Sequence, residues 1–197
     1  MKILLIGATG HIGSAVAARL GAAHEVVAVT RSSVPSVDIV DPGSIAALYD
    51  AVGTVDAVIS TVGSAPFKPL ADLGREDFLA GFTHKTLGQI EIVRQGIPHL
   101  SDGGSFTLTS GIVGRHQIRT GAAAAMANGA LEHFGPAAAV ELPRGIRINV
   151  VSPTVLLEAT GYHPSFPGYV PVPAAIVAEA YVKSVEGVET GCVYILD

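Results

Sequence analysis

Three glycines near the N-terminus have the spacing of a nucleotide-binding turn. A short apolar run that starts at Met1 is typical of a buried parallel strand, and Gly7, Gly10 and Gly13 follow it on the way into a helix. Gly7 permits a tight turn, Gly10 lets the backbone approach a pyrophosphate, and Gly13 lets the helix pack close to the strand. The free N–H groups of the helix then point at the anion. The alternative is an ordinary strand-to-helix turn, because the Gly-x-x-Gly-x-x-Gly pattern is one residue longer than Gly-x-Gly-x-x-Gly.

The charge that follows the second apolar run indicates which dinucleotide the turn would take. After Glu25–Val29 come Thr30, Arg31, Ser32 and Ser33, with no Asp or Glu. An acidic side chain at this point binds the free 2′-hydroxyl of NAD, whereas an arginine accepts the 2′-phosphate of NADP. Arg31 offers a planar fork of donors, to which Ser32 can add a hydroxyl. NADP is therefore favoured over NAD, and a solvated turn arginine is the alternative.

One candidate proton-transfer residue lies in the loop after the predicted strand Ser105–Thr109. The loop 111–120 brings His116 to the carboxyl edge of the sheet. Histidine has a suitable intrinsic pKa for proton transfer near neutrality, although a solvated loop histidine is the alternative.

Other site chemistries find no support in the residue pattern. The seven histidines and the single cysteine, Cys192, show no metal-ligand spacing, so we expect no metal site and no internal disulfide. Ser110 lacks the Gly-x-Ser-x-Gly elbow of hydrolases. The net charge of −5 and the absence of a large basic cluster disfavour nucleic acid and anionic membrane as partners. No apolar run is long enough for a signal peptide or a membrane span, which predicts a cytoplasmic protein.

The elements that must position these residues alternate between strands and helices. This pattern, with 49% hydrophobic residues, predicts a single domain over residues 1–197: an α/β, Rossmann-type, doubly wound parallel sheet of about seven strands with helices on both faces. After the first two strands, the predicted strands are Val37–Val40, Asp56–Ser60, Ser105–Thr109, Ile146–Val151 and Cys192–Leu196. Because Arg31–Ser36 is too short for a crossover helix, the second crossover helix is expected to be missing.

Two long helices and one late loop have further implications. Asp72–Leu100 and Thr120–Leu142 are predicted helices that could pair with their copies in a homodimer or homotetramer, or else simply pack on their own sheet. The irregular segment Glu158–Pro173 leaves the carboxyl end of the sixth predicted strand. It is a candidate substrate lid, and a plain surface connection is the alternative.

With these motifs in order, the chain resembles the short-chain dehydrogenase/reductase family over nearly its whole length. The most specific pieces are a small-residue helix that ends in Ala130-Leu-Glu132 and the later segment Arg147-Ile-Asn-Val-Val-Ser-Pro153. The resemblance implies a nicotinamide dinucleotide as cofactor. It also implies cofactor contacts at Gly7, Thr9, Gly10, His11, Ile12 and Gly13 with the pyrophosphate, at Asp38 and Ile39 with the adenine, at Thr61, Val62 and Gly63 after a central strand, and at Pro153 and Val155 beside the nicotinamide.

The catalytic positions depart from the family. Its members use a Tyr-x-x-x-Lys pair, and the resemblance places Ala124 at the tyrosine and Asn128 at the lysine. Asn128 can still bind a ribose, but Ala124 cannot transfer a proton. Lys85 falls at the family's helix-four asparagine, from which it reaches the ribose or faces solvent. Ser110 is at the substrate-orienting serine or one residue from it, with Gly111 as the other register.

The sequence therefore leaves three functional hypotheses. The first is an NADP(H)-dependent oxidoreductase of this family that acts on a small carbonyl or alcohol, in which Ser110, a loop residue or water moves the proton. The second is a catalytically altered NADP(H)-binding or ligand-sensing protein. The third is a non-redox enzyme that reuses the pocket, because fold alone does not decide chemistry.

Overall fold

Six parallel strands form one sheet in the computed structural model, which describes residues 1–197. The strand order is β2-β1-β3-β4-β5-β6. The strands are β1 (Lys2–Ile6), β2 (Glu25–Val29), β3 (Val55–Ser60), β4 (Leu100–Thr109), β5 (Arg147–Pro153) and β6 (Val193–Leu196). The chain leaves β1 toward β2 on one side and later adds β3 on the other, so the order reverses between β1 and β3. A ligand is expected beyond the carboxyl ends of these two strands.

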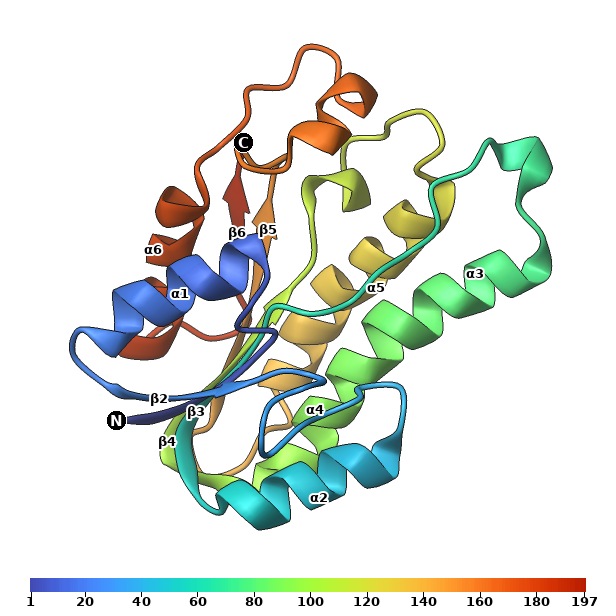
Figure 1. The fold of residues 1–197 in the computed structure, drawn as a ribbon. Helices are drawn as coiled ribbons and strands as arrows, with labels where there is room; N and C mark the ends of the chain where they lie inside the picture. The colour runs from blue at the N-terminus through green and yellow to red at the C-terminus, as the bar shows by residue number, and fades with distance from the viewer.

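Helices cover both faces of the sheet, as predicted (Figure 1). Helices α1 (His11–Gly21) and α6 (Ala174–Glu186) lie side by side on one face, and α2 (Pro42–Val52), α4 (Gly88–Gly96) and α5 (Ala122–Ala139) lie on the other. The predicted long helix before β4 is a continuous run of α3 (Arg75–Gly81), a π-helical segment (Phe82–Leu87) and α4. None of these helices is long and apolar enough to cross a membrane.

Alternation along β1 divides the core between the two faces. Leu4 and Ile6 belong to the cluster under α2, α4 and α5, whereas Ile3 and Leu5 belong to the cluster under α1 and α6. All four side chains are fully buried. Because successive side chains of a strand point to opposite faces, an unbroken apolar run is what a strand covered on both sides requires.

The predicted strand Val37–Val40 is wrong, and the sheet has six strands rather than about seven. These residues form a loop that fixes its own backbone groups: Val37 N–H donates to the Thr30 carbonyl, and Val40 N–H donates to the Asp38 carboxylate. Asp41 then caps α2. With its amides bonded locally, the segment cannot add to the edge of β2. The expectation of a missing second crossover helix is also wrong, because α2 follows β2 and is the crossover to β3.

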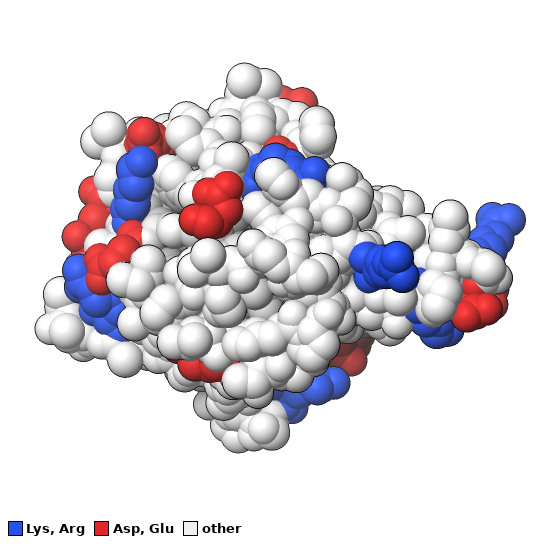
Figure 2. Space-filling model, turned by 90° about the horizontal axis from the view of Figure 1, so that it is seen from above, with Lys and Arg blue, Asp and Glu red and all other residues white.

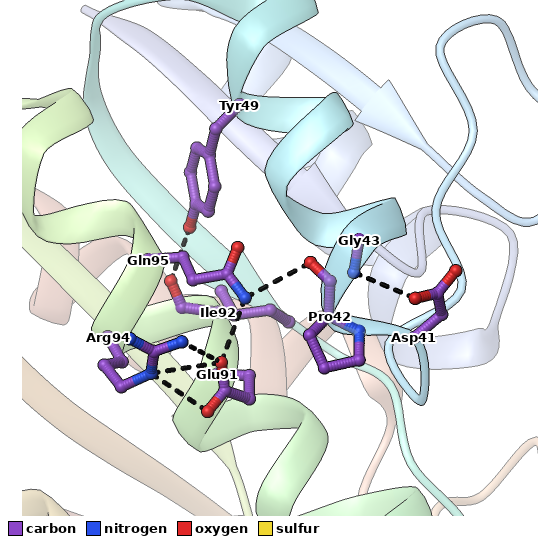
Figure 3. A network of polar contacts seen from close by, with 8 residues as sticks. All are labelled: Asp41, Pro42, Gly43, Tyr49, Glu91, Ile92, Arg94 and Gln95. Atoms are coloured by element: carbon purple, nitrogen blue, oxygen red, sulfur yellow. Dashed lines mark hydrogen bonds and ion pairs between the residues drawn. The ribbon is translucent and has the colours of Figure 1, made fainter.

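Polar contacts tie α2 to α4 beneath this loop (Figure 3). The buried Tyr49 hydroxyl donates to the Ile92 carbonyl at 2.6 Å, and burial raises the Tyr49 pKa well above its usual value. Gln95 donates both to the Pro42 carbonyl and to the Glu91 carboxylate. Since α4 continues directly from the π-helical segment, these contacts also fix the position of that segment over the sheet.

The late loop lies where the sequence placed it. Residues between β5 and α6 are irregular apart from a 3-10 turn, Thr160–Ser165, and a single bridge between Leu156 and Val172.

Candidate functional site

Two cavities meet at the carboxyl ends of β1 and β3, where the strand order reverses. The first has a volume of about 490 Å³ and the second about 300 Å³, and Gly10 and Thr61 line both. The first is lined by Ile6, Gly7, Thr9, Gly10, Thr30, Arg31, Ser32, Val37, Asp38, Ile39, Thr61, Val62, Gly63, Ser64 and His84. The second is lined by Gly10, His11, Ile12, Thr61, Phe67, Ser110, Gly111, Ile112, Val113, Pro153, Thr154, Val155, Leu156, Ala159, Tyr162 and Phe166.

The glycine turn is closed too tightly for side chains at two of its three glycines. Gly7 has φ +93°, and a Cβ there would lie 2.5 Å from a methyl carbon of Val62. A Cβ on Gly13 would lie 2.1 Å from the Gly7 carbonyl oxygen, so α1 packs directly against the turn. Gly10 has no such close neighbour and faces both cavities. The backbone at the start of α1 is therefore accessible from both cavities.

The far end of the first cavity carries the side chains expected to choose the nucleotide. Arg31 and Ser32 are exposed and line it, and Thr30 lies beside them. Asp38 is the only acidic residue that lines this cavity, and its carboxylate accepts the Val40 amide within its own turn. A free guanidinium at this end favours a phosphate over a bare hydroxyl.

The second cavity is mainly apolar, and two loops border it. The Phe67 and Tyr162 rings pack at 5.9 Å, which joins the segment after β3 to the late loop. His11 and Tyr162 are the only residues with ionisable side chains that line this cavity. Figure 2 looks down on the face toward which β5 and β6 point in Figure 1, and charged side chains on it are scattered, with no broad basic patch. Such a cavity suits an uncharged ligand.

A buried acid holds the side chain of Ser110. Its hydroxyl donates to Glu132 Oε1 at 2.8 Å, and the Ser152 hydroxyl donates to the same oxygen at 2.7 Å. Arg115 completes the network, 2.7 Å from Glu132 Oε2 and 3.0 Å from the Ser152 hydroxyl. The Glu132 side chain is only 6% exposed, so this ion pair fastens the loop after β4 to α5 and β5.

The two positions that correspond to the family's catalytic pair are Ala124, which is part of an apolar cluster, and Asn128, which has an unpartnered amide oxygen. Ala124 is buried in a small cluster with Ile112, Val113, Val155 and Phe166. Asn128 is 6% exposed, and its Oδ1 is buried without a hydrogen-bond partner. A Cβ on Gly111 would lie 3.5 Å from Asn128 Nδ2, so the other possible register of the serine lies next to this amide.

Lys85 comes from the π-helical segment and reaches the end of β4. Its Nζ donates to the Ser110 carbonyl at 3.3 Å, and burial lowers the pKa of this ammonium to about 8. A Cβ on Gly63 would lie 2.9 Å from the Lys85 Cα, so the lysine backbone packs against the segment that follows β3.

Most of the residues proposed from the sequence lie together at these two cavities, but four of them do not line either one. Gly13 lies where α1 packs against the turn, and its backbone contacts Gly7. Lys85 and Asn128 contact the Ser110–Gly111 segment but line neither cavity. His116 is exposed, bonds to no side chain and lines neither cavity, so the structure does not bring it to Ser110. Nor is there any group of three acidic, histidine or cysteine side chains that could hold a metal ion.

Sequence reasoning missed several residues that line the cavities. Ser64, His84 and Phe67 belong to the segment after β3 and to the π-helix, and Thr154 directly follows β5. The Thr154 hydroxyl is buried without a partner. For Ser64, Phe67 and Thr154, the position just past the carboxyl end of a predicted strand was the available signal. His84, within the π-helical segment, gave no such signal.

The residues present fit a nicotinamide dinucleotide. The glycine turn, which admits no Cβ at Gly7 or Gly13, suits the pyrophosphate. Arg31 lies on the side that would hold the adenosine, and the apolar cavity beyond Gly10 lies on the side that would hold the nicotinamide. The unpartnered Asn128 and Thr154 oxygens near the second cavity leave hydrogen-bonding capacity for a polar ligand group.

Comparison with solved structures shows the same architecture in other proteins. The protein lin1944 from Listeria innocua is 51% identical, with a TM-score of 0.98 and full coverage of both chains. A small-chain dehydrogenase in complex with NADPH is 26% identical, with a TM-score of 0.88, over 100% of this chain and 96% of the other.

Comparison at the level of sequence gives the family. The short chain dehydrogenase claC of Passalora fulva is 32% identical over 116 residues, which are 54% of this chain and 41% of that protein. Across five such relatives the match covers between 37% and 57% of the relative, so the chain spans about half their length. A family model described as enoyl-(acyl carrier protein) reductase matches residues 8–190. The chain belongs to the short-chain dehydrogenase/reductase family.

Proposed function

We propose that this chain is an NADP(H)-dependent oxidoreductase that interconverts a small uncharged carbonyl compound and its alcohol. The observation that carries the proposal is the junction of the two cavities at Gly10 and Thr61, which puts a phosphate-binding turn and an apolar pocket on one continuous surface. NADPH, when bound, supplies a hydride to the carbonyl carbon. The chain's own residues hold the phosphates, orient the nicotinamide and exclude water from the pocket.

Arg31 supports the choice of NADP(H). It lines the first cavity beside Ser32 and Thr30, and Asp38, the acidic residue nearby, is bonded to its own turn. The NADPH complex of a small-chain dehydrogenase with this fold is consistent with the same preference here.

The second cavity supports the substrate class. Phe67, Tyr162 and Phe166 give it an aromatic wall, and no Lys, Arg, Asp or Glu lines it. An aromatic or aliphatic aldehyde or ketone could therefore bury its apolar part there without leaving an unpaired charge.

The test is the fall of NADPH absorbance in the presence of a panel of aromatic and aliphatic aldehydes and ketones, with the alcohol product identified by mass spectrometry. We expect substrate-dependent oxidation and a matching alcohol. If NADPH binds but no member of the panel is reduced, the oxidoreductase proposal fails. A nucleotide-binding sensor would then be the better reading, and the buried Ala124 at the family's tyrosine position is the observation that favours it.

For assembly, we propose pairing with a second copy through the long helices. Leu79 on α3, Leu87 at the end of the π-helical segment and Met126 on α5 are large apolar side chains with 54%, 40% and 41% exposure. The helices that carry them lie side by side on one face of the molecule (Figure 1). Light scattering would give a mass of two or more chains, and a monomer at micromolar concentration would refute this pairing.

A further inference from the structure

Lys85 is held between the ends of two central strands. The π-helical segment Phe82–Leu87 carries it over Gly63, which follows β3, and its Nζ lies 3.3 Å from the Ser110 carbonyl at the end of β4. Ser110 and Gly111 line the apolar cavity. The ammonium is therefore at the back of the wall where the family's catalytic side chains are missing.

This ammonium has no acidic partner. The acids of the three helices that pack on the π-helical segment are engaged elsewhere: Asp77 of α3 with Lys68, Glu91 of α4 with Arg94, and Glu132 of α5 with Arg115. The remaining ionisable side chains on these elements are the exposed His84, Arg75, Glu76 and His133. Burial is the only cause that lowers the Lys85 pKa to about 8.

The other lysines of the chain show that this environment is specific to Lys85. Lys68 and Lys183 pair with Asp77 and Glu189 at the surface, and Lys2 donates to the Val52 carbonyl. Lys85 is partly buried, and a partly buried charge without a counter-ion costs free energy. Such groups gather at functional sites.

A second, independent observation lies at the same peptide. Asn128 Oδ1 is buried and unpartnered, and its Nδ2 lies beside the space that a side chain on Gly111 would fill. Buried polar atoms are rarely left without a partner, so Asn128 Oδ1 has hydrogen-bonding capacity for a water or a ligand hydroxyl.

We propose that Lys85 is the acid–base residue of this site, in the place of the missing tyrosine. The proposal rests on the proposed oxidoreductase function. In the reducing direction, the carbonyl carbon gains the hydride of NADPH, and the carbonyl oxygen takes one proton from the Lys85 ammonium through one water held at Asn128, because Lys85 itself lines neither cavity. Lys85 becomes a neutral amine and regains a proton from solvent. The products are the alcohol and NADP⁺, so charge and atoms balance.

The other candidate donors are bonded elsewhere or exposed. The Ser110 hydroxyl is directed to Glu132, and the Tyr181 hydroxyl bonds to Thr109 in the interior. His116 is away from the cavity, and Tyr162 lies at its rim with 53% exposure. An ammonium that titrates near pH 8 is matched to proton transfer close to neutrality.

The first experiment measures Lys85 itself and needs no substrate. The protein is acetylated by a trace of acetic anhydride at a series of pH values, with and without NADP⁺, and each lysine is quantified by peptide mass spectrometry. We expect the reactivity of Lys85 to rise with a midpoint near pH 8, and that of Lys68 and Lys183 to rise only at higher pH. At about ten times its Kd, NADP⁺ should reduce the labelling of Lys85 about tenfold and leave Lys183 unchanged. A Lys85 that titrates with the other lysines, or that NADP⁺ does not protect, overturns the proposal.

The second experiment separates chemistry from binding. Lys85→Arg keeps a positive charge but cannot release a proton, and Lys85→Met keeps only the apolar stem. With the best carbonyl of the panel, we expect both to lose about 10²–10³-fold in kcat, to bind NADPH within a few fold of the parent, and to melt as cooperatively as the parent by circular dichroism. Lys183→Met is the matched control and should keep the parent kcat.

The outcomes distinguish this proposal from the function on which it rests. If the parent reduces a carbonyl and Lys85→Arg is equally fast, the acid–base role is refuted and the oxidoreductase function stands. If the parent binds NADPH and reduces nothing, the oxidoreductase function is refuted, and the role of Lys85 with it.

Discussion

The hydroxyl of Ser110 donates to the buried carboxylate of Glu132, and the two oxygens lie 2.8 Å apart. Ser110 was the serine nearest to the expected catalytic position, yet its proton is directed into the protein rather than into the cavity. Glu132 also accepts from Ser152 and pairs with Arg115. Ser110 therefore belongs to a structural network that fixes the wall of the apolar cavity.

We expect Glu132→Gln to lower the free energy of unfolding by about 2–3 kcal/mol, because it leaves the half-buried Arg115 guanidinium without its counter-ion. Guanidinium chloride denaturation measures the change. Glu141→Gln, at an exposed position past the end of α5, is the control and should change stability by less than about 0.5 kcal/mol. Equal stability of the two variants would show that the network carries no net stabilisation.

Two glycines of α1, Gly13 and Gly21, allow a matched comparison. A methyl group on Gly13 would lie 2.1 Å from the Gly7 carbonyl oxygen, whereas one on Gly21, the last residue of α1, meets nothing within 4 Å. We expect Gly13→Ala to lose about 1–3 kcal/mol of stability and most of its dinucleotide affinity. Gly21→Ala should be neutral or more stable by up to about 1 kcal/mol. Thermal melting with and without NADP⁺ checks both, and a Gly13→Ala variant that is shifted by NADP⁺ as far as the parent contradicts the model of the turn.

Lys85 should make stability depend on pH in a definite direction. Its folded-state pKa of about 8 lies below the 10.5 of a free lysine, so between these values the unfolded chain binds more protons, and stability rises with pH. Below pH 8 the full cost of the buried charge is present. We therefore expect Lys85→Met to be more stable than the parent at pH 7 by about 2–3 kcal/mol, with a difference that shrinks as the pH rises toward 10.5. Urea denaturation at pH 7, 8 and 9 measures it.

Lys183→Met is the control for this pH series. Lys183 is 58% exposed and pairs with Glu189, so its loss should cost little and should not reproduce the trend. A constant difference between Lys85→Met and the parent over this range would mean that Lys85 titrates normally.

The parts of this structure that are local in sequence could be predicted, and the non-local parts could not. The apolar run Ile3–Ile6 and the glycines after it define β1 and its turn by themselves. Val37–Val40 has the composition of a strand, but the Val37 and Val40 amides donate to Thr30 and Asp38 instead of to a neighbouring strand. No local sequence pattern shows these hydrogen bonds. The partnership of Ser110 with Glu132 spans 22 residues and depends on how α5 packs on β4.

The site shows the same division. Arg31 lies at the first cavity because it comes two residues after the end of β2. Asp38 lies there although the strand predicted around it does not form. The wall formed by Phe67 and Tyr162 joins two loops that are far apart in the chain, so its aromatic character could not be predicted from either loop alone.

The apolar cavity should discriminate by charge. No Lys or Arg lines it, so a carboxylate buried there would have no cationic partner. With NADPH, we expect kcat/KM for 4-methylbenzaldehyde to exceed that for 4-formylbenzoate by at least about tenfold, or ~1.4 kcal/mol. Initial rates at low substrate concentration give the ratio. A preference for the carboxylate would mean that a different surface binds the substrate.

Calorimetric titration with NADP⁺ and NAD⁺, on the parent and on Arg31→Ala, is the most direct test of the central claim. We expect NADP⁺ to bind the parent at least about tenfold more tightly than NAD⁺, and Arg31→Ala to weaken NADP⁺ by roughly 10- to 100-fold while it leaves NAD⁺ almost unchanged. Arg75→Ala, which removes an exposed arginine at the start of α3, should bind both nucleotides like the parent. If neither nucleotide binds the parent, the cleft is not a dinucleotide site, and the proposed function is wrong.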